Sequence, residues 1–153
     1  MSPEREAFSY AEDIYRYVFA RINHAEEAED ITMEVVHAAK TANAKNLKAY
    51  MIGIARRKIA DHYRHKNSDQ PVSSVEDSIV LTDADEFIRI QMVLSRLSDN
   101  YQECLVLKYV CGFSSEEIGT MLSTSPGAVD NTLQRARKAF AHEWNLLNGD
   151  HDE

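Results

Sequence analysis

The order of apolar and polar positions predicts a chain built from short helices. Between Ser98 and Phe140, three runs carry apolar residues at steps of three and four, the spacing that places side chains on one face of a helix. No run alternates between apolar and polar residues as a half-buried strand does. With only five Gly and three Pro in 153 residues, the sequence predicts an all-α fold.

Two tight breaks separate these three helices. The first helix, Tyr101 to Val110, is expected to end at Gly112, because glycine tolerates the left-handed conformation of a helix stop. Ser114 opens the second helix with Glu117 three residues on, the spacing of a capping box. After a short polar break, Pro126 stands at the first position of the third helix, where its missing N–H does no harm.

The third helix separates a buried stripe from a polar face. Residues at steps of three and four form the stripe: Val129, Leu133, Ala136, Phe140 and Trp144. The opposite face carries Gly127, Asn131, Arg135, Lys138 and His142. A short helix, a tight turn and a second helix with an exposed Asn/Arg/Lys face is the helix-turn-helix arrangement for the DNA major groove. An ordinary three-helix bundle has the same spacing, so the pattern alone leaves both interpretations open.

The first half of the chain predicts three more helices, over residues 8–22, about 25–41 and 47–65. Their inward residues are expected to be Ile14, Tyr15, Val18, Phe19 and Ile22, then Ile31, Val35, Ala38 and Ala39, then Leu47, Met51, Ile54 and Ile59. Residues 67–83 are polar, acidic and without periodicity, which indicates a flexible linker. We therefore expect two small helical domains, 1–66 and 84–145, and an acidic tail over 146–153.

Charge is distributed in blocks. The whole chain carries a formal charge of −8, yet residues 40–66 hold eight Lys or Arg and one Asp, a balance of +7. Such a local block is typical of a nucleic-acid-binding surface. Its cations interleave with Tyr50 and Tyr63, so bases could stack on rings while cations follow phosphates. Alternatively the tyrosines belong to the core and the cations only solubilise the helix.

Two blocks of motifs resemble one known family. The run from Leu94 to Phe140, with Phe113-Ser114, Glu117-Ile118 and Gly127-Ala128-Val129, is similar to region 4 of bacterial sigma factors of the extracytoplasmic-function (ECF) group. Ala28-Glu29-Asp30-Ile31-Thr32 and Leu47-Lys48-Ala49-Tyr50-Met51 resemble region 2 of the same factors. Both blocks stand in the family's order, and together they cover most of the chain.

This resemblance implies a transcription initiation factor, and it assigns roles to residues. Core RNA polymerase would be bound at its clamp helices by Asp30 and Glu34, and at its flap by the second domain. The −10 DNA would be held and opened by Asn46, Tyr50, Arg56, Arg57 and Lys58. The −35 element would be read by Ser125, Gly127, Asn131 and Arg135, with Lys138 on phosphate. A further partner implied by the family is an anti-sigma factor.

The sequence departs from the family at some of these positions. Tyr50 and Arg57 stand where the family usually has Trp and Asn, which alters the melting segment. Asp130 stands in the recognition helix where a basic or small residue is common. Its carboxylate would either repel a DNA phosphate or accept a hydrogen bond from cytosine N4.

Other classes of function find little support in the sequence. Cys104 and Cys111 lie about 10 Å apart along one helix, too far for a disulfide, and are expected to be buried, reduced thiols. His62 and His65 lack the spacing of a zinc site, and neither a phosphate-binding loop nor a nucleophile elbow occurs. We therefore expect no enzyme, cofactor, metal or membrane insertion, and a cytoplasmic protein. The alternatives are a sigma-like regulator that does not initiate transcription and a stand-alone helix-turn-helix protein.

Overall fold

The structure is a computed structural model that describes residues 3–66 and 85–149. Within these ranges the chain forms helices and no strand, which confirms the all-α prediction. The elements are α1 (Pro3–Ser9), α2 (Ala11–Ile22), α3 (Ala25–Ala39), α4 (Leu47–Lys66), α5 (Asp85–Ser95), α6 (Asp99–Leu105), the π-helical turn η2 (Val106–Val110), α7 (Ser115–Leu122) and α8 (Pro126–Leu147). The predicted linker at 67–83, and residues 150–153 of the predicted tail, lie outside the described residues.

The first half contains four helices where the sequence predicted three. The expected helix over 8–22 is interrupted at Tyr10, whose ψ of 4° leaves the helical range, so α1 and α2 are separate helices. α2 ends at Asn23, which takes the left-handed conformation with φ 58°. α3 ends at Ala39, two residues before the predicted position.

The core of the first half contains more residues than the periodicity identified. Most of the predicted inward positions are buried, among them Ile14, Val18, Val35 and Met51. Tyr17, Val36 and Ile52, which the periodicity did not single out, are also almost fully buried. The prediction for Ala38 was wrong: it is exposed, because the buried face of α3 is centred on other residues, Ala28, Val35 and Ala39.

The helix predicted over 101–110 changes its winding halfway along. It begins at Asp99 with Ser98 as its N-cap, and after Leu105 it widens into the π-helical turn η2. The Cys111 N–H donates to the Val106 carbonyl at 3.0 Å, five residues back rather than four. Val110 at the end of this wider turn is 38% exposed.

The helix-turn-helix unit is formed as the sequence predicts. Gly112 has a φ of 83°, which suits glycine, and it ends η2. Ser114 and Glu117 form the reciprocal capping box: the Glu117 N–H donates to Ser114 Oγ at 3.1 Å, and the Ser114 N–H donates to Glu117 Oε1 at 2.9 Å. Ser123, at φ 61°, ends α7, and Pro126 begins α8. These devices fix the direction in which α8 leaves the turn.

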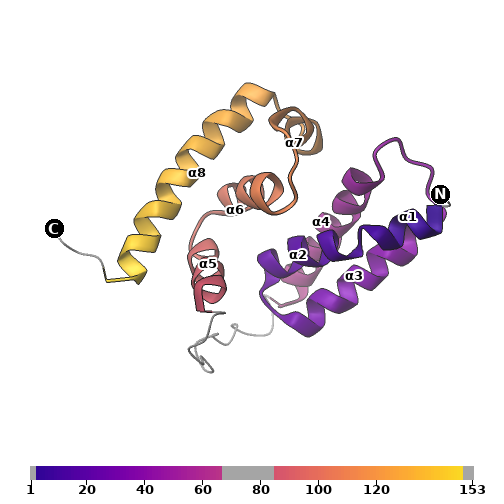
Figure 1. The fold of residues 1–153 in the computed structure, drawn as a ribbon, viewed down its shortest axis with the longest axis horizontal. Coiled ribbons are helices and arrows are strands. Elements are labelled where there is room, and N and C mark those ends of the chain that lie inside the picture. Colours follow the sequence, from indigo (N-terminus) through magenta and orange to yellow (C-terminus); the bar gives the residue numbers. More distant parts are fainter. Residues whose placement is uncertain (1–2, 67–84, 150–153) are drawn as a thin grey trace.

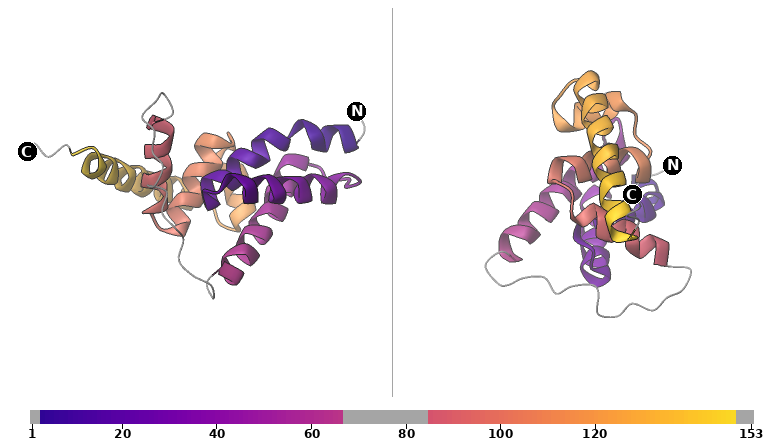
Figure 2. Two further views of the ribbon diagram at one scale, coloured as in Figure 1. Left: turned by 90° about the horizontal axis from the view of Figure 1, so that it is seen from below. Right: turned by 90° about the vertical axis from the view of Figure 1, so that its left-hand side faces the viewer.

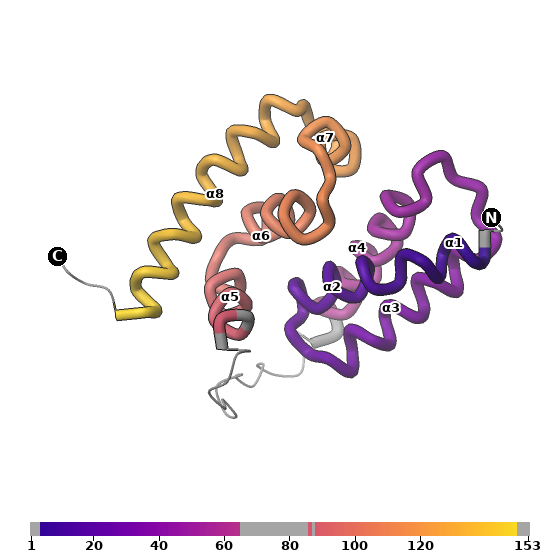
Figure 3. The backbone as a smooth tube through the Cα atoms, in the orientation of Figure 1, coloured from indigo at the N-terminus to yellow at the C-terminus, as the bar shows by residue number. Residues whose placement is uncertain are grey.

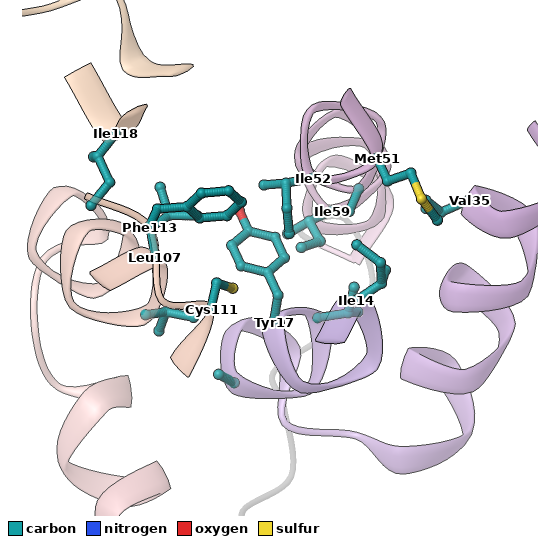
Figure 4. Close-up of a cluster of buried hydrophobic side chains, with 14 of the residues drawn as sticks. Ile14, Tyr17, Val35, Met51, Ile52, Ile59, Leu107, Cys111, Phe113 and Ile118 are labelled. Carbon is teal, nitrogen blue, oxygen red and sulfur yellow. The ribbon is translucent and has the colours of Figure 1, made fainter. Parts of the chain in front are cut away.

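The two halves lie against each other and share one core. Figure 1 shows α1–α4 on one side and α5–α8 on the other, with α6 between α8 and the first half, and the turned views of Figure 2 agree. The backbone tube of Figure 3 shows α8 on the side away from α1–α4. A single cluster of buried apolar residues runs through both halves. In Figure 4, Leu107, Cys111 and Phe113 lie beside Tyr17 and Ile52.

The turn between α7 and α8 depends on a glycine. A Cβ atom at Gly119 would lie 2.7 Å from the carbonyl oxygen of Thr124, which is backbone and has little freedom to move. At this point the Thr124 N–H donates to the Gly119 carbonyl at 2.8 Å. By contrast, a Cβ at Gly53 in the middle of α4 would meet nothing within 4 Å.

We expect Gly119→Ala to lower the free energy of unfolding by about 1–3 kcal/mol, because the added methyl group forces α7 and the turn apart. The matched control Gly53→Ala should leave stability unchanged or raise it by up to about 1 kcal/mol, since alanine is the better helix former. Chemical denaturation followed by far-UV circular dichroism measures both. Equal losses in the two variants would contradict the close approach at Gly119.

Both thiols are buried, as predicted. Burial raises the pKa of Cys111 to about 12, although Lys48 acts in the opposite direction. Burial, and secondarily the charge of Glu103, also raise the pKa of Cys104. Because the thiolate is the reactive form, both groups should be inert in the folded protein.

Reaction with a disulfide reagent at neutral pH tests this expectation. We expect both thiols of the native protein to react at least about a hundredfold more slowly than in the denatured chain, since burial suppresses both access and ionisation. One thiol that reacts as fast in the native as in the denatured protein would contradict the packing described above.

Candidate nucleic-acid interface

The outer face of α8 presents the residues predicted to read DNA. Gly127, Asn131, Arg135 and Lys138 are all exposed, as the periodicity predicted. Val129, Leu133 and Ala136, on the opposite face, are almost fully buried. Ser125 is exposed as well, but its hydroxyl accepts a hydrogen bond from the Ala128 N–H at 3.0 Å and caps the helix. The structure thus exposes these residues of α8 on the face opposite its buried stripe.

Asp130 has an internal partner that the sequence did not reveal. The Ser115 hydroxyl donates to Asp130 Oδ1 at 2.5 Å, joining the start of α7 to the second turn of α8. The carboxylate therefore braces the helix-turn-helix unit, a role outside the two alternatives of base contact and phosphate repulsion. No local sequence signal connects residues 15 positions apart, which is why the sequence reasoning missed this bond.

The basic helix α4 distributes its predicted DNA-binding residues over different environments. Tyr50, 45% exposed, and Arg57, also exposed, are seven residues apart and so lie on one side of the helix. Lys58 pairs instead with Glu34 of α3 at 3.1 Å. Asn46 lies just before α4, where its Oδ1 accepts from the Ala49 N–H at 3.1 Å. The structure thus leaves Tyr50 and Arg57 exposed together.

Arg56 turns towards the second half of the chain. Its Nε lies 3.0 Å from Glu103 Oε2, and its Nη1 donates to the Met121 carbonyl at 3.4 Å. Nearby on the same side of α4, Lys48 donates to the Cys111 carbonyl at 2.6 Å and lies 5.1 Å from the centre of the Phe113 ring. These two cations of the basic block therefore make contacts within the protein.

The outer face of α3 combines acids with an exposed methionine. Asp30 and Glu34, predicted to bind the polymerase, are exposed and one helical turn apart. Met33 lies on the same side of the helix and is 45% exposed. The sequence did not identify Met33, because a single apolar residue outside the inward-facing positions carries no pattern that shows whether it is exposed. Together Asp30, Met33 and Glu34 form a surface with an apolar centre and acidic edges.

Glu103 of α6 is the centre of a buried ionic cluster that the sequence also did not predict. Its side chain is 9% exposed. Tyr17 Oη donates to Glu103 Oε2 at 2.6 Å, Arg21 pairs with Oε1, and Arg56 pairs with Oε2. All three partners belong to the first half, 47 to 86 residues away along the chain.

The cluster fixes the protonation of its members. Burial and then the charge of Glu103 raise the pKa of Tyr17 well above its ordinary value, so its hydroxyl stays a donor. Burial lowers the pKa of Arg21, but Glu103 and neighbouring groups more than offset this, and the net pKa is raised. Away from this cluster, Gln91 Nε2 of α5 also joins the halves, because it donates to the Phe19 carbonyl at 3.2 Å.

Neither a metal-binding cluster nor a membrane-spanning helix is found in the part of the chain that the structure describes. Among residues 3–66 and 85–149, no group of three or more His, Cys, Asp or Glu is placed to hold a metal ion. Over the same part of the chain, no helix has both the length and the apolar character needed to cross a membrane.

Comparison with known proteins finds similar chains in one family. Residues 87–140 match the family model for sigma-70, region 4. The chain is 26% identical over 152 residues to the ECF RNA polymerase sigma factor BldN of Streptomyces coelicolor, an alignment that covers 86% of this chain and 56% of BldN. It is 28% identical over 150 residues to the ECF RNA polymerase sigma factor SigM of Bacillus subtilis, covering 89% of this chain and 91% of SigM.

A solved structure shares the fold. The sigma factor RpoE of Bartonella quintana, crystallised in complex with the anti-sigma factor NepR, superposes with a TM-score of 0.77. The match covers 93% of this chain and 96% of RpoE at 18% sequence identity, so it concerns the fold alone. The likeness extends over both halves of the chain.

Proposed function

The chain belongs to the ECF group of the sigma-70 family, and on this premise we propose that it directs core RNA polymerase to promoters through the −10 and −35 elements. The observation that carries this proposal is the outer face of α8. A capped helix-turn-helix unit holds that face clear of the core with Asn131, Arg135 and Lys138 exposed. Arg135 and Asn131 would contact base edges, while Ser125 and Gly127 lie where the helix begins and Lys138 would meet a phosphate.

The −10 element would be engaged by the exposed side of α4. Tyr50 offers a ring on which an unpaired base can stack, and Arg57 offers a cation on the same side. Residues 41–46, ending in Asn46, would line the pocket for that base. Arg56 and Lys58 would join them only after giving up their contacts with Glu103 and Glu34.

Binding to the polymerase would use the outer face of α3. Asp30 and Glu34 suit a basic partner, and the exposed Met33 between them adds an apolar contact to the centre of the interface. The clamp helices of the polymerase would contact this surface, while the second half would contact the flap. The dependence on polymerase also fits the chain's net charge of −8, which weakens DNA binding by the free protein.

Regulation and location follow from the same premise. Since RpoE was crystallised with an anti-sigma factor, we infer that this chain also has an anti-sigma partner. It would act in the cytoplasm, where the polymerase is. It would supply recognition and DNA opening, and the polymerase would supply all catalysis.

The proposal is tested by run-off transcription with core RNA polymerase and a library of promoter fragments, with and without the protein. Specific transcripts that appear only with the protein would establish the function and reveal both promoter elements. Tight polymerase binding without transcripts would support a sigma-like regulator instead. DNA binding without polymerase binding would leave a stand-alone helix-turn-helix protein.

We expect Arg135→Ala to weaken promoter binding by the holoenzyme roughly 5- to 150-fold, the loss of about 1–3 kcal/mol for one base contact. Arg137→Ala is the matched control, since it removes the same charge from the same helix. The Arg137 guanidinium, however, donates to the Tyr109 hydroxyl at 2.9 Å within the protein. Electrophoretic mobility shifts on the selected promoter measure both, and equal losses would mean that only net charge matters.

We expect Asp30→Arg to abolish polymerase binding and, with it, the transcripts, because it reverses the charge at one of the two acidic edges of that surface. The control Glu4→Arg reverses an exposed charge on α1 that is not one of the three residues of that surface, and should bind core polymerase as the wild type does. Fluorescence anisotropy of labelled protein titrated with core polymerase compares them. Retained binding by Asp30→Arg would refute the assignment of α3.

A further inference from the structure

Glu103 is a buried acid at the boundary between the two halves of the chain. It is a nearly buried carboxylate in α6 of the second half, and its three partners belong to α2 and α4 of the first half. Two of them, Arg21 and Arg56, are cations, and the third, Tyr17, is a fully buried phenol. The carboxylate has these three partners only while the two halves are packed together, and water replaces them when the halves separate.

Contacts between the two halves also involve two cations of α4. The Arg56 Nε pairs with the Glu103 carboxylate, and its Nη1 donates to the Met121 carbonyl of α7. Lys48, two turns earlier on the same side, donates a hydrogen bond from its ammonium group to the Cys111 carbonyl at the end of η2. The helix with the densest positive charge in the chain therefore presents one side to the second half rather than to solvent.

We propose that the second half is an internal competitor of promoter DNA for α4, held in place by Glu103. This inference rests on the proposed function of α4 as the −10-binding helix. In the packed state Glu103 neutralises Arg56, and the carbonyls of Cys111 and Met121 hold Lys48 and Arg56. A DNA strand gains Arg56 only when the halves separate; separation also releases Lys48 from the Cys111 carbonyl, although its ion pair with Asp13 of α2, at 3.4 Å, remains.

The ionic cluster around Glu103 should hold the two halves together strongly, and the term latch refers below to this cluster. Removing one partner of a buried ion pair is costly, because the remaining charges stay in a medium that solvates them poorly. Without the carboxylate, Arg56 would lose its ion pair, and Arg21 would keep only the exposed Asp99, at 3.7 Å. Separation of the halves returns both guanidinium groups to water, whereas each half keeps its own helix contacts, α2 with α3 and α4, and α6 with α8. Loss of Glu103 should therefore open the molecule.

The first readout is the distance between the halves, which is independent of DNA. Dyes are attached to cysteines introduced at two exposed positions, Ser9→Cys in α1 and Asn145→Cys in α8. Because Cys111 packs beside Tyr17 at the boundary between the halves and opening would uncover it, all labelled proteins also carry Cys104→Ala and Cys111→Ala. We expect Glu103→Gln to lower the energy transfer between the dyes, while its far-UV circular dichroism stays that of the wild type.

The second readout is the affinity of the free protein for a short, mixed-sequence, single-stranded oligonucleotide. We expect Glu103→Gln to tighten it at least about fivefold, because apparent affinity scales with the population of the binding-competent state. Asp99→Asn is the matched control. It removes one negative charge from the same helix, but the Asp99 side chain is 91% exposed and lies 3.7 Å from Arg21. It should change neither readout by as much as twofold.

A second pair of variants tests the latch without changing any charge. Tyr17→Phe removes only the hydroxyl that donates to Glu103 across the halves. Tyr63→Phe also removes one hydroxyl hydrogen bond, but its acceptor is the Arg21 carbonyl inside the first half. We expect Tyr17→Phe to shift both readouts in the direction of Glu103→Gln, about twofold in affinity, and Tyr63→Phe to shift neither. These variants decide the question if Glu103→Gln fails to fold.

The outcomes separate this inference from the proposed function. Unchanged dye distances in Glu103→Gln or Tyr17→Phe would overturn the latch. Increased distances with unchanged oligonucleotide affinity would overturn the competition for α4. Equal effects of Tyr17→Phe and Tyr63→Phe would mean that each variant only destabilises the protein in general. That outcome would also overturn the proposed role of Glu103. Failure of the proposed function would appear separately, as absence of promoter transcripts from the wild-type holoenzyme.

Discussion

The Glu103 carboxylate sets the relative position of the two halves. It accepts from Tyr17 and pairs with Arg21 and Arg56, so one side chain in α6 is tied to two different helices of the first half. A buried charge with three directional partners tolerates little displacement, whereas the apolar contacts around it, such as Phe113, accommodate sliding. The direction of the helix-turn-helix unit relative to α4 therefore depends on this residue together with the other polar contacts between the halves, from Lys48 to Cys111 and from Gln91 to Phe19.

Within the second half, local devices determine how α8 is presented. The reciprocal capping box at Ser114 starts α7, the left-handed Ser123 stops it, and Ser125 caps α8 immediately afterwards. The close approach at Gly119 keeps the turn short, and the bond from Ser115 to Asp130 closes it on the outside. Each contact is modest alone, but together they leave α8 one direction, with its buried stripe inward and its polar face outward.

The basic block of residues 40–66 illustrates how packing divides a uniform charge pattern. Arg56 contacts the second half, Lys58 pairs with Glu34 of α3, and Arg57 between them is exposed. Neighbouring cations thus serve three different purposes, because successive residues of a helix point about 100° apart. The balance of +7 overstates the charge that a nucleic acid could contact in this packed arrangement.

The sequence by itself determined the features that depend on neighbours along the chain. The helical periods, the stop at Gly112, the capping box at Ser114 and the two faces of α8 all follow from side-chain spacing and backbone preference, which are local. Sequence reasoning alone could not find the burial of Tyr17 or the partner of Asp130. Nor could it find the cluster around Glu103, which looks like one more surface acid in an acidic stretch. Those features join residues 15 to 86 positions apart, and only the tertiary structure decided them, because helix packing alone brings such residues together.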